Sequence, residues 1–389
     1  MAGGAPLIYM DNAATSWPKA PGVAEAVARS LSEPLGSPGR GTHPAAVSAE
    51  RMVFEARTAA AALFQFPEPA RLIFTPGTTS SINMVLRGTL RPGALVAVSG
   101  MEHNAVMRPL RVLEKELRLT VRVFPSDPEG CPDLEAFRGI MREKPSLLFF
   151  TSASNVTGTA FPFAEMARSA AGISPDTQIG IDAAQSAGEV PIDLGSFPFD
   201  FFCVSPHKGL LSPAGLGLLF LGPRAAPAPL VYGGTGSDSQ SEEQPAFLPD
   251  RYESGTQNLP AIAGLLAAAR CIQETGMAVL AARRRNAAES LREGIADLPG
   301  FRVFGPRNAE RRVSILSIAH ERMAVDELAL SLDERGISCR HGLHCSPAAH
   351  RTIGTLSSGG TIRVSPGPFT TQGEVDQTLE ALRQIGAEA

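Results

Sequence analysis

A single lysine, Lys208, lies between two apolar segments of the chain. The first segment, residues 200–204, ends at the turn Ser205-Pro-His207, and the second segment begins near Gly215. A cation is costly to bury in such surroundings, and a desolvated amine has a lowered pKa and becomes a nucleophile toward carbonyl groups. We therefore interpret Lys208 as the residue that holds a carbonyl cofactor as a Schiff base. A surface lysine at the tip of a loop is the alternative interpretation.

The segment Thr75-Pro-Gly-Thr-Thr-Ser80 follows an apolar run at residues 72–74 and opens a predicted helix. Gly77, Thr78 and Thr79 would present free backbone N–H groups and hydroxyl groups at the positive end of that helix. Such an arrangement suits a phosphate group. An ordinary helix N-cap is the alternative interpretation.

Three further polar residues, His103, Asn155 and Asp182, each follow a short apolar run. The His103 ring could stack over a planar cofactor or transfer protons. The Asn155 amide could hydrogen-bond a ring oxygen, and the Asp182 carboxylate could keep a pyridine nitrogen protonated. Taken singly, these residues could be an inert loop histidine, an ordinary turn and a helix cap. Together with the phosphate-binding turn and the isolated lysine, they indicate a site for pyridoxal phosphate.

Short apolar segments alternate with helical segments between residues 72 and 220. The predicted strands are Leu72–Phe74, Leu95–Val98, Val121–Phe124, Leu147–Phe150, Ile179–Ile181, Phe199–Val204 and Leu216–Phe220. This alternation predicts an α/β fold with a mostly parallel seven-stranded sheet. Because ligands of open α/β sheets bind beyond the carboxyl ends of the strands, we expect the polar residues above to share one site.

The chain of 389 residues is longer than one typical domain. We predict an N-terminal segment at residues 1–20 that packs with the small domain. A large cofactor-binding domain would span residues 21–259, and a small α+β domain would span residues 260–389. The polar, turn-rich segment 232–256 would form a long loop before the small domain, and long loops in compact domains are usually functional or mobile.

Composition excludes several classes of function. The formal net charge of −4 argues against nucleic acid as a main partner. No apolar run is long enough to span a bilayer, and the N-terminus lacks the basic and apolar regions of a signal peptide. We therefore expect a cytoplasmic protein without a membrane partner. The five cysteines lack C-x-x-C spacing, so we expect neither a disulfide framework nor a metal site.

A series of short motifs occurs in the order and spacing of one enzyme family. The motifs are Asp11-Asn-Ala-Ala-Thr15, Gly77-Thr-Thr79, Met101-Glu-His103, Ser154-Asn-Val-Thr-Gly-Thr159, Asp182-Ala-Ala-Gln185, Ser205-Pro-His-Lys208 and Glu253-Ser-Gly-Thr256. In them the chain resembles the class V aminotransferases, which are fold-type I pyridoxal phosphate enzymes, from about residue 7 to residue 375. Within that family it is most similar to cysteine desulfurases and selenocysteine lyases of the short-loop group.

The resemblance implies a role for each motif. Lys208 would hold the cofactor and act as the proton-transfer base, and His103 would stack on the cofactor ring. Asp182 would pair with the pyridine nitrogen, while Gln185 and Asn155 would contact the ring hydroxyl. The implied phosphate ligands are Thr79, Ser205 and His207, with Thr78 adjacent. Thr256 would be contributed by the neighbouring subunit of a homodimer with shared active sites.

The C-terminal segment Arg340-His-Gly-Leu-His-Cys345 can provide a second reactive group. A cysteine beside a histidine and near an arginine can be held as a reactive thiolate. In short-loop desulfurases this motif carries the thiolate that attacks the substrate sulfur, which implies that role for Cys345. Cys203, inside an apolar strand, is expected to be a buried and inert thiol, and Cys339 lies outside the motif.

Three more residues are candidates for substrate binding. Arg363 matches the family arginine that binds the substrate carboxylate, a task suited to a planar guanidinium group; a surface arginine on a strand is the alternative. Arg340 would support the substrate or the cysteine, Asn155 would also lie against the substrate, and His43 matches an active-site loop position.

Together these residues predict a pyridoxal phosphate-dependent cysteine desulfurase that converts L-cysteine to L-alanine and leaves a persulfide on Cys345. L-Selenocysteine is the other substrate expected from the resemblance, and a sulfur-acceptor protein is an expected partner. One alternative is another class V reaction on a small amino acid, such as epimerisation, β-elimination or transamination, in which Cys345 is incidental. A non-catalytic protein that binds the cofactor is a further alternative.

Overall fold

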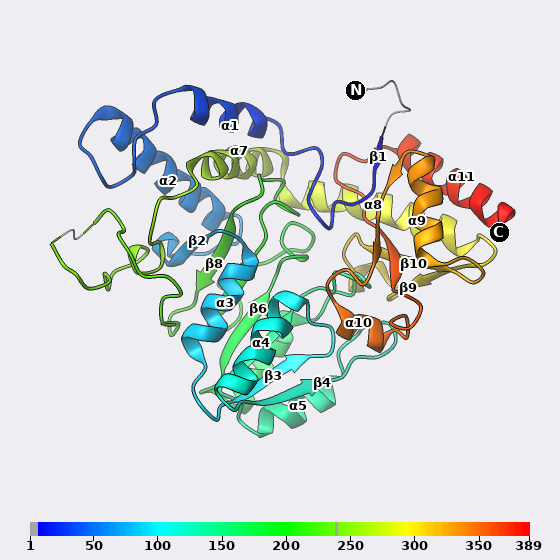
Figure 1. Cartoon of the computed structure of the whole chain (residues 1–389), viewed down its shortest axis with the longest axis horizontal. Helices are drawn as coiled ribbons and strands as arrows, with labels where there is room; N and C mark the ends of the chain where they lie inside the picture. The colour runs from blue at the N-terminus through cyan, green and yellow to red at the C-terminus, as the bar shows by residue number, and fades with distance from the viewer. Residues whose placement is uncertain (1–6, 238–239) are drawn as a thin grey trace.

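The computed structural model describes residues 7–237 and 240–389 of the chain (Figure 1). Residues 1–6, part of the predicted N-terminal segment, lie outside the described residues, as do residues 238–239 of the predicted long loop. Figure 1 shows a large lobe that contains β2 to β8 and a smaller lobe that contains β9, β10 and the C-terminal helix.

The larger sheet has seven strands in the order β2-β8-β7-β6-β5-β3-β4. Only β8 is antiparallel to its neighbours, β7 and β2, and the remaining pairs of adjacent strands are parallel. The sheet therefore confirms the predicted fold class. The strands are β2 (Leu72–Thr75), β3 (Leu95–Ser99), β4 (Thr120–Phe124), β5 (Leu147–Thr151), β6 (Gln178–Asp182), β7 (Phe201–Val204) and β8 (Gly217–Leu221).

Helices cover both faces of this sheet, which explains why its central strands are continuous apolar runs rather than alternating ones. One face packs with helices α3 (Thr78–Thr89) and α4 (Asn104–Glu116). The other face packs with helices α1 (Val23–Ser32), α2 (Pro44–Ala62), α5 (Leu134–Arg142), α6 (Phe163–Ile173) and α7 (Leu259–Thr275). In the part of the chain that the structure describes, three single turns of 3₁₀ helix lie in the connections, at Pro69–Arg71, Asp250–Tyr252 and Ala309–Arg311.

The smaller sheet is antiparallel, in the order β12-β13-β10-β9. Its core is a separate apolar cluster that also contains the Ile8 side chain of the N-terminal strand β1. The strand β1 (Ile8–Tyr9) pairs in parallel with β11 (Ile337–Ser338), so the start of the described chain lies beside this sheet. The other elements are β9 (Phe301–Phe304), β10 (Leu316–His320), β12 (Arg340–Gly342), β13 (Thr361–Val364), α8 (Met277–Ala296), α9 (Val325–Glu334), α10 (Pro347–Thr352) and α11 (Gln372–Glu388).

The helices α7 and α8 connect the two sheets and meet at Gly276 with a bend of 85°. Six buried side chains of α7 belong to the cluster of the large sheet, whereas Ala287, Leu291 and Ile295 of α8 belong to the cluster of the small sheet. The domain limits at residues 20 and 260 stay predictions. Within the described residues, no single helix is long and apolar enough to cross a membrane, and α7 with α8 meets that criterion only as a bent pair.

Candidate active site

A cavity of about 210 Å³ lies at the carboxyl ends of the parallel strands. Chain segments that follow β2, β3, β5, β6 and β7 meet here, because strands that run in parallel end at the same edge of the sheet. Every residue that the sequence predicted for the cofactor lines this cavity, apart from Thr256. The lining residues are Gly77, Thr78, Thr79, His103, Ala105, Thr151, Ala153, Asn155, Asp182, Ala184, Gln185, Ser205, His207 and Lys208.

Lys208 lies in the turn after β7, where its backbone N–H donates to the Ser205 carbonyl oxygen over 3.1 Å. Burial lowers the pKa of its ammonium group to about 8, and the Asp182 carboxylate opposes that shift. A larger fraction of the side chain is therefore the neutral amine near pH 7 than for an exposed lysine. A neutral amine in a cavity can attack a carbonyl carbon, which is the chemistry expected from the sequence.

The N-terminus of α3 forms one end of the cavity. This helix begins at Gly77 without a side-chain cap, so the first N–H groups of the helix have no side-chain acceptor. Hydroxyl groups of Thr78 and Ser205 lie 2.6 Å apart beside it. Gly217 of β8 packs directly behind the turn, because a Cβ atom there would lie 2.7 Å from the Thr78 nitrogen. Uncapped N–H groups and hydroxyls at a positive helix end can hold a phosphate group.

Asp182 and His103 are two of the titratable side chains that line the cavity. Asp182 ends β6, its Oδ1 accepts from the Ala184 N–H over 2.9 Å, and burial raises the pKa of this carboxyl group. His103 caps α4, and its Nδ1 accepts from the Ala105 N–H over 2.9 Å. Burial, followed by the positive charge of Lys208, lowers the pKa of His103 to about 4. The ring is thus neutral at pH 7, with its proton on Nε2 because Nδ1 accepts.

His207 and Gln185 connect the cavity to the N-terminal segment. The His207 Nδ1 lies 3.1 Å from the Thr15 hydroxyl, and the Gln185 Nε2 donates to the Ala13 carbonyl over 3.1 Å. Burial is the largest cause that lowers the pKa of His207 to about 4. Lys19 donates to the His207 carbonyl oxygen over 3.0 Å. The segment after β1 therefore positions two of the cavity residues.

Asn155 joins the cavity to the cysteine loop, which we define as residues 343–346. Its Nδ2 donates to the His344 carbonyl oxygen over 2.7 Å, and its Oδ1 accepts from the Ser346 hydroxyl over 2.7 Å. Those two residues flank Cys345. A carboxamide nitrogen has two N–H donors, so one donor of Asn155 remains for a ligand in the cavity.

Cys345 is exposed, and its Sγ lies 3.5 Å from the Arg340 Nη2. The Asn104 N–H, at the start of α4, donates to the Cys345 carbonyl oxygen over 2.8 Å. His344 and Cys345 have φ angles of 47° and 58°, in the left-handed region that residues other than glycine rarely occupy. An accessible thiol beside a guanidinium group is suited to act as a nucleophile.

The other free cysteines differ from Cys345 in burial. Cys203 is fully buried in β7, as predicted, and burial raises the pKa of its thiol. Burial also raises the pKa of Cys339, to about 12. Neither thiol forms a thiolate readily at neutral pH, so Cys345 is better placed for nucleophilic chemistry than these two residues.

Arg363 is buried on β13, next to Asn155. Its Nη2 donates to the Asp11 Oδ1 over 2.8 Å, and its Nη1 donates to the Asn155 carbonyl oxygen over 3.3 Å. Its Nε is buried without a hydrogen-bond partner among the described residues. The guanidinium group is therefore fixed beside the cavity but does not line it, and these bonds use two of its five N–H donors.

The structure places His43 and Thr256 away from the cavity around Lys208. His43 is exposed and caps α2, where its Nδ1 accepts from the Ala46 N–H over 3.3 Å. Thr256 lines a different cavity, of about 290 Å³. The nearby Glu253 carboxylate accepts from Nη1 and Nη2 of the buried Arg57 guanidinium, at 2.7 and 2.8 Å. Neither predicted site residue contacts the cavity of its own chain.

Glu102 is a buried residue of this region to which the sequence analysis assigned no role. Its Oε1 accepts from the Ser99 hydroxyl and from the Thr151 N–H, the latter over 2.9 Å. Burial raises the pKa of Glu102 to about 8, so the carboxyl group is mostly protonated at pH 7. Its bonds join the ends of β3 and β5 directly before His103. In the sequence, the signal that could have pointed to Glu102 was an acidic residue shortly after an apolar strand.

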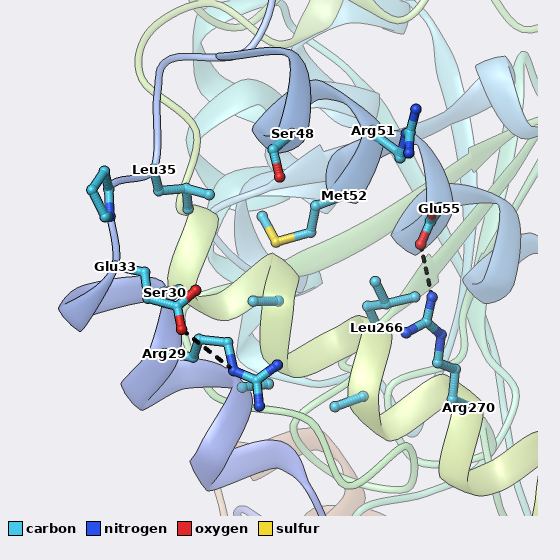
Figure 2. A pocket seen from close by; sticks show the side chains of 14 residues that line it. Arg29, Ser30, Glu33, Leu35, Ser48, Arg51, Met52, Glu55, Leu266 and Arg270 are labelled. Atoms are coloured by element: carbon cyan, nitrogen blue, oxygen red, sulfur yellow. Dashed lines mark hydrogen bonds and ion pairs between the residues drawn. The ribbon is translucent and has the colours of Figure 1, made fainter. Parts of the chain in front are cut away.

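Another cavity, of about 340 Å³, lies between α1, α2 and α7 (Figure 2). Arg270 pairs with Glu55 there over 2.7 Å, and Arg29 lies 4.0 Å from Glu33. Its lining residues include no lysine, histidine or cysteine. Its lining therefore offers no amine, imidazole or thiol, in contrast to the cavity that contains Lys208, His103 and His207.

Asp127, Glu129 and Cys131 are close enough together to be considered as metal ligands. They lie in a turn after β4, and the Asp127 Oδ1 accepts from the N–H groups of the other two residues, each over 2.9 Å. These two hydrogen bonds stabilise a turn of the backbone, and the turn explains why the three side chains lie close together.

The fold and the cavity together define a fold-type I α/β enzyme, with its site at the carboxyl edge of a seven-stranded sheet. Residues 8–378 match the family model of the class V aminotransferases. The chain belongs to this family of pyridoxal phosphate enzymes.

Several proteins described as cysteine desulfurases are similar to this chain over at least 98% of its length. A probable cysteine desulfurase of Mycolicibacterium paratuberculosis is 30% identical over 98% of this chain, which spans 56% of that protein's length. A probable cysteine desulfurase of Mycobacterium leprae is 29% identical over 100% of this chain and 94% of that protein. The solved structure of a cysteine desulfurase from Thermococcus onnurineus NA1 aligns with a TM-score of 0.91 at 25% identity, over 98% of this chain and 95% of that one.

Proposed function

We propose that the protein is a pyridoxal phosphate-dependent cysteine desulfurase. L-Cysteine and the Cys345 thiol would give L-alanine and a persulfide on Cys345. The observation that carries this proposal is the pair of Asn155 hydrogen bonds that hold an exposed cysteine beside a lysine-containing cavity. The relatives described as cysteine desulfurases support the same reaction.

The cavity residues fit pyridoxal phosphate in three respects. The uncapped start of α3 at Gly77, with the Thr78 and Ser205 hydroxyls, offers donors to a phosphate group. The second oxygen of Asp182 can pair with a pyridine nitrogen, and the Lys208 amine can attach to an aldehyde. When bound, the cofactor supplies an electron sink for the substrate carbon atoms. The predicted roles of Thr79, His103, Asn155, Gln185 and His207 are part of this proposal.

The protein supplies a proton carrier and a sulfur acceptor. The Lys208 amine, whose pKa is lowered to about 8, can take a proton from the substrate α-carbon and return one to it near neutral pH. The Cys345 Sγ attacks the substrate sulfur, so that an S–S bond forms as the substrate C–S bond breaks. The carbon that loses the sulfur gains a hydrogen, which balances the overall reaction as alanine and a protein persulfide.

Substrate binding and assembly form the rest of the proposal. Arg363 binds the substrate carboxylate with the donors that Asp11 leaves free, and Arg340 stabilises the Cys345 thiolate. Because Thr256 and His43 lie away from this chain's cavity, we assign them to the site of the partner in a homodimer. The proposal also includes L-selenocysteine as a second substrate, a sulfur-acceptor protein as a partner and a cytoplasmic location.

The test is mass spectrometry of the purified holoenzyme after incubation with L-cysteine. We expect one added sulfur on the peptide that contains Cys345, together with free alanine. Cys345→Ser should lose both products, whereas Cys271→Ser, which changes a partly buried cysteine of α7, should retain them. Unchanged alanine formation by Cys345→Ser would remove the thiolate step and leave another class V reaction.

A further inference from the structure

Behind the cysteine loop, the rings of two buried histidines lie side by side. His344 and His350 are 2% and 0% exposed, and their ring centroids are 5.5 Å apart. Each ring has one nitrogen bonded to a threonine hydroxyl, His344 Nε2 to Thr361 over 3.2 Å and His350 Nδ1 to Thr355 over 2.7 Å. The other nitrogens, His344 Nδ1 and His350 Nε2, are buried without a partner among the described residues.

The bonds beyond Thr361 fix the direction of this network. The Ser317 hydroxyl donates to the Val156 carbonyl oxygen over 2.7 Å, because a carbonyl can only accept. Ser317 therefore accepts from the Thr361 hydroxyl, at 3.0 Å. Thr361 has then used its hydrogen and must accept from His344 Nε2–H. In the neutral ring, His344 Nδ1 consequently carries a lone pair that requires a donor.

His350 can provide that donor. If the Thr355 hydroxyl donates to His350 Nδ1, the proton of the neutral ring lies on Nε2, the nitrogen without a partner. The two unpartnered nitrogens are then one donor and one acceptor on neighbouring rings. Burial is the largest cause that lowers the pKa of both histidines, to about 2 for His344 and about 4 for His350, so both rings are neutral at pH 7.

We propose that His350 is a positioning residue for Cys345, because it donates from Nε2 to His344 Nδ1 and completes a one-directional chain of hydrogen bonds. The ring centroids are 5.5 Å apart and the ring planes are inclined by 41°, so the bond forms on rotation of the rings about their Cβ–Cγ bonds. The chain runs from Thr355 through His350, His344, Thr361 and Ser317 to the Val156 carbonyl. Val156 is adjacent to Asn155, whose side chain bonds to His344 and Ser346 of the cysteine loop.

The backbone of the loop explains why such support is needed. His344 and Cys345 are consecutive non-glycine residues in the left-handed region, a conformation that is strained for residues with a Cβ atom. Strained conformations persist only where the surroundings determine them. Asn155 and Asn104 hold the loop through backbone atoms on the cavity side, and the histidine pair would hold the His344 side chain on the opposite side.

Hydrogen exchange of the holoenzyme, measured without substrate, tests the proposal directly. His350→Leu removes both ring nitrogens, and we expect exchange in peptides covering residues 343–348 to become at least tenfold faster. His350→Gln keeps an N–H donor on a side chain of similar reach and should restore part of the protection. His320→Leu is the control. His320 is a buried histidine of β10 that is packed against Phe301 and takes no part in this series of hydrogen bonds.

The inference rests on the proposed function only for its catalytic consequence. Cysteine sulfinate carries an oxidised sulfur that can leave as sulfur dioxide without a thiol to receive it. We therefore expect His350→Leu to lower kcat for L-cysteine at least tenfold, with little change in KM or in sulfinate turnover. The behaviour of Cys345→Ser toward L-cysteine tests the proposed function separately.

Equal exchange of the cysteine loop in wild type, His350→Leu and His320→Leu would overturn the proposal. So would faster exchange throughout the small lobe in both variants, which would indicate general destabilisation. If His350→Leu does not fold, Thr355→Val provides the same test, because it removes the outermost donor with little change in volume. Unchanged loop protection in Thr355→Val would then also overturn the proposal.

Discussion

The Asn155 side chain and the His344 main chain are joined by a hydrogen bond of 2.7 Å, although 189 positions separate them in the sequence. Asn155 follows β5 of the large sheet and lines the cavity, whereas His344 precedes the cysteine in the smaller lobe. One amide therefore reaches both reactive parts of the proposed site. A ligand that bonds the second Asn155 N–H would also stabilise the position of the cysteine loop.

This relationship predicts the effect of Asn155→Ala. Both side-chain bonds to the cysteine loop would be lost, and a misplacement of about 1 Å can cost a reaction roughly 100-fold. We expect kcat for L-cysteine to fall between about 10- and 100-fold. The alkylation rates of Cys271 and of the other thiols should not decrease. The matched control is Asn308→Ala, which removes an exposed amide bonded only to the Glu310 N–H. Equal rates for wild type and Asn155→Ala would contradict the positioning role.

The sequence predicted the large sheet because its strands are apolar runs separated by helices, and local pattern is enough to show that. It also predicted which residues share the cavity, since Thr78, Asp182 and Lys208 each follow a strand of one parallel sheet. The geometry of parallel strands then brings them to a common edge. For these residues, the spacing along the chain and the topology carry the same information.

The contacts across the two lobes could not be predicted in this way. Asn155 was expected to contact a cofactor ring, and nothing near it in sequence indicates its bonds to His344 and Ser346. His350 lies within the short helix α10, which begins at Pro347, and belongs to no motif. Only its burial and its position beside His344 bring it to notice. Such contacts depend on how one lobe packs on the other.

The pKa of Lys208 predicts a pH dependence of stability. Its ammonium group has a pKa of about 8 in the folded, cofactor-free protein and the ordinary value of 10.5 when unfolded. Between these values the unfolded chain binds more protons, so this group makes the free energy of unfolding rise with pH. Below about pH 8 the buried charge destabilises the fold, and Lys208→Met should relieve that cost.

Urea denaturation of the cofactor-free protein at several pH values checks this expectation. Lys208→Met should be more stable than wild type at pH 7, and the difference should shrink as the pH rises toward 10. Lys115→Met, at an exposed lysine of α4, serves as the control and should show no such trend. A stability difference for Lys208→Met that does not vary with pH would contradict the lowered pKa.

The buried ion pair of Arg363 and Asp11 predicts a large loss of stability on removal of one partner. Asp11→Ala would leave the guanidinium group, whose side chain is 2% exposed, without its carboxylate, and breaking such a pair costs about 3 kcal/mol. Asp11→Ala combined with Arg363→Met should recover much of that loss, because no charge then remains buried. Thermal or urea unfolding measures both, with Asp326→Ala, at an exposed carboxylate, as the control. Additive losses in the double variant would contradict this account.

The start of α3 packs so closely against Gly217 of β8 that no side chain fits at this position. A Cβ atom at this position would lie 2.4 Å from the Gly77 carbonyl carbon and 2.7 Å from the Thr78 nitrogen, and backbone atoms cannot move aside as a flexible side chain can. Gly217→Ala should therefore displace the phosphate-binding turn, weaken retention of pyridoxal phosphate by at least tenfold and lower the stability of the protein. Equilibrium dialysis followed by the absorbance of the bound cofactor measures the retention.

Gly172→Ala in α6 is the matched control, because a Cβ atom there meets nothing within 4 Å. This variant should stabilise the protein by about 0.5–1 kcal/mol, because alanine has a higher helix propensity than glycine. If Gly217→Ala retained the cofactor as well as Gly172→Ala does, the turn at Gly77 would not be the phosphate site.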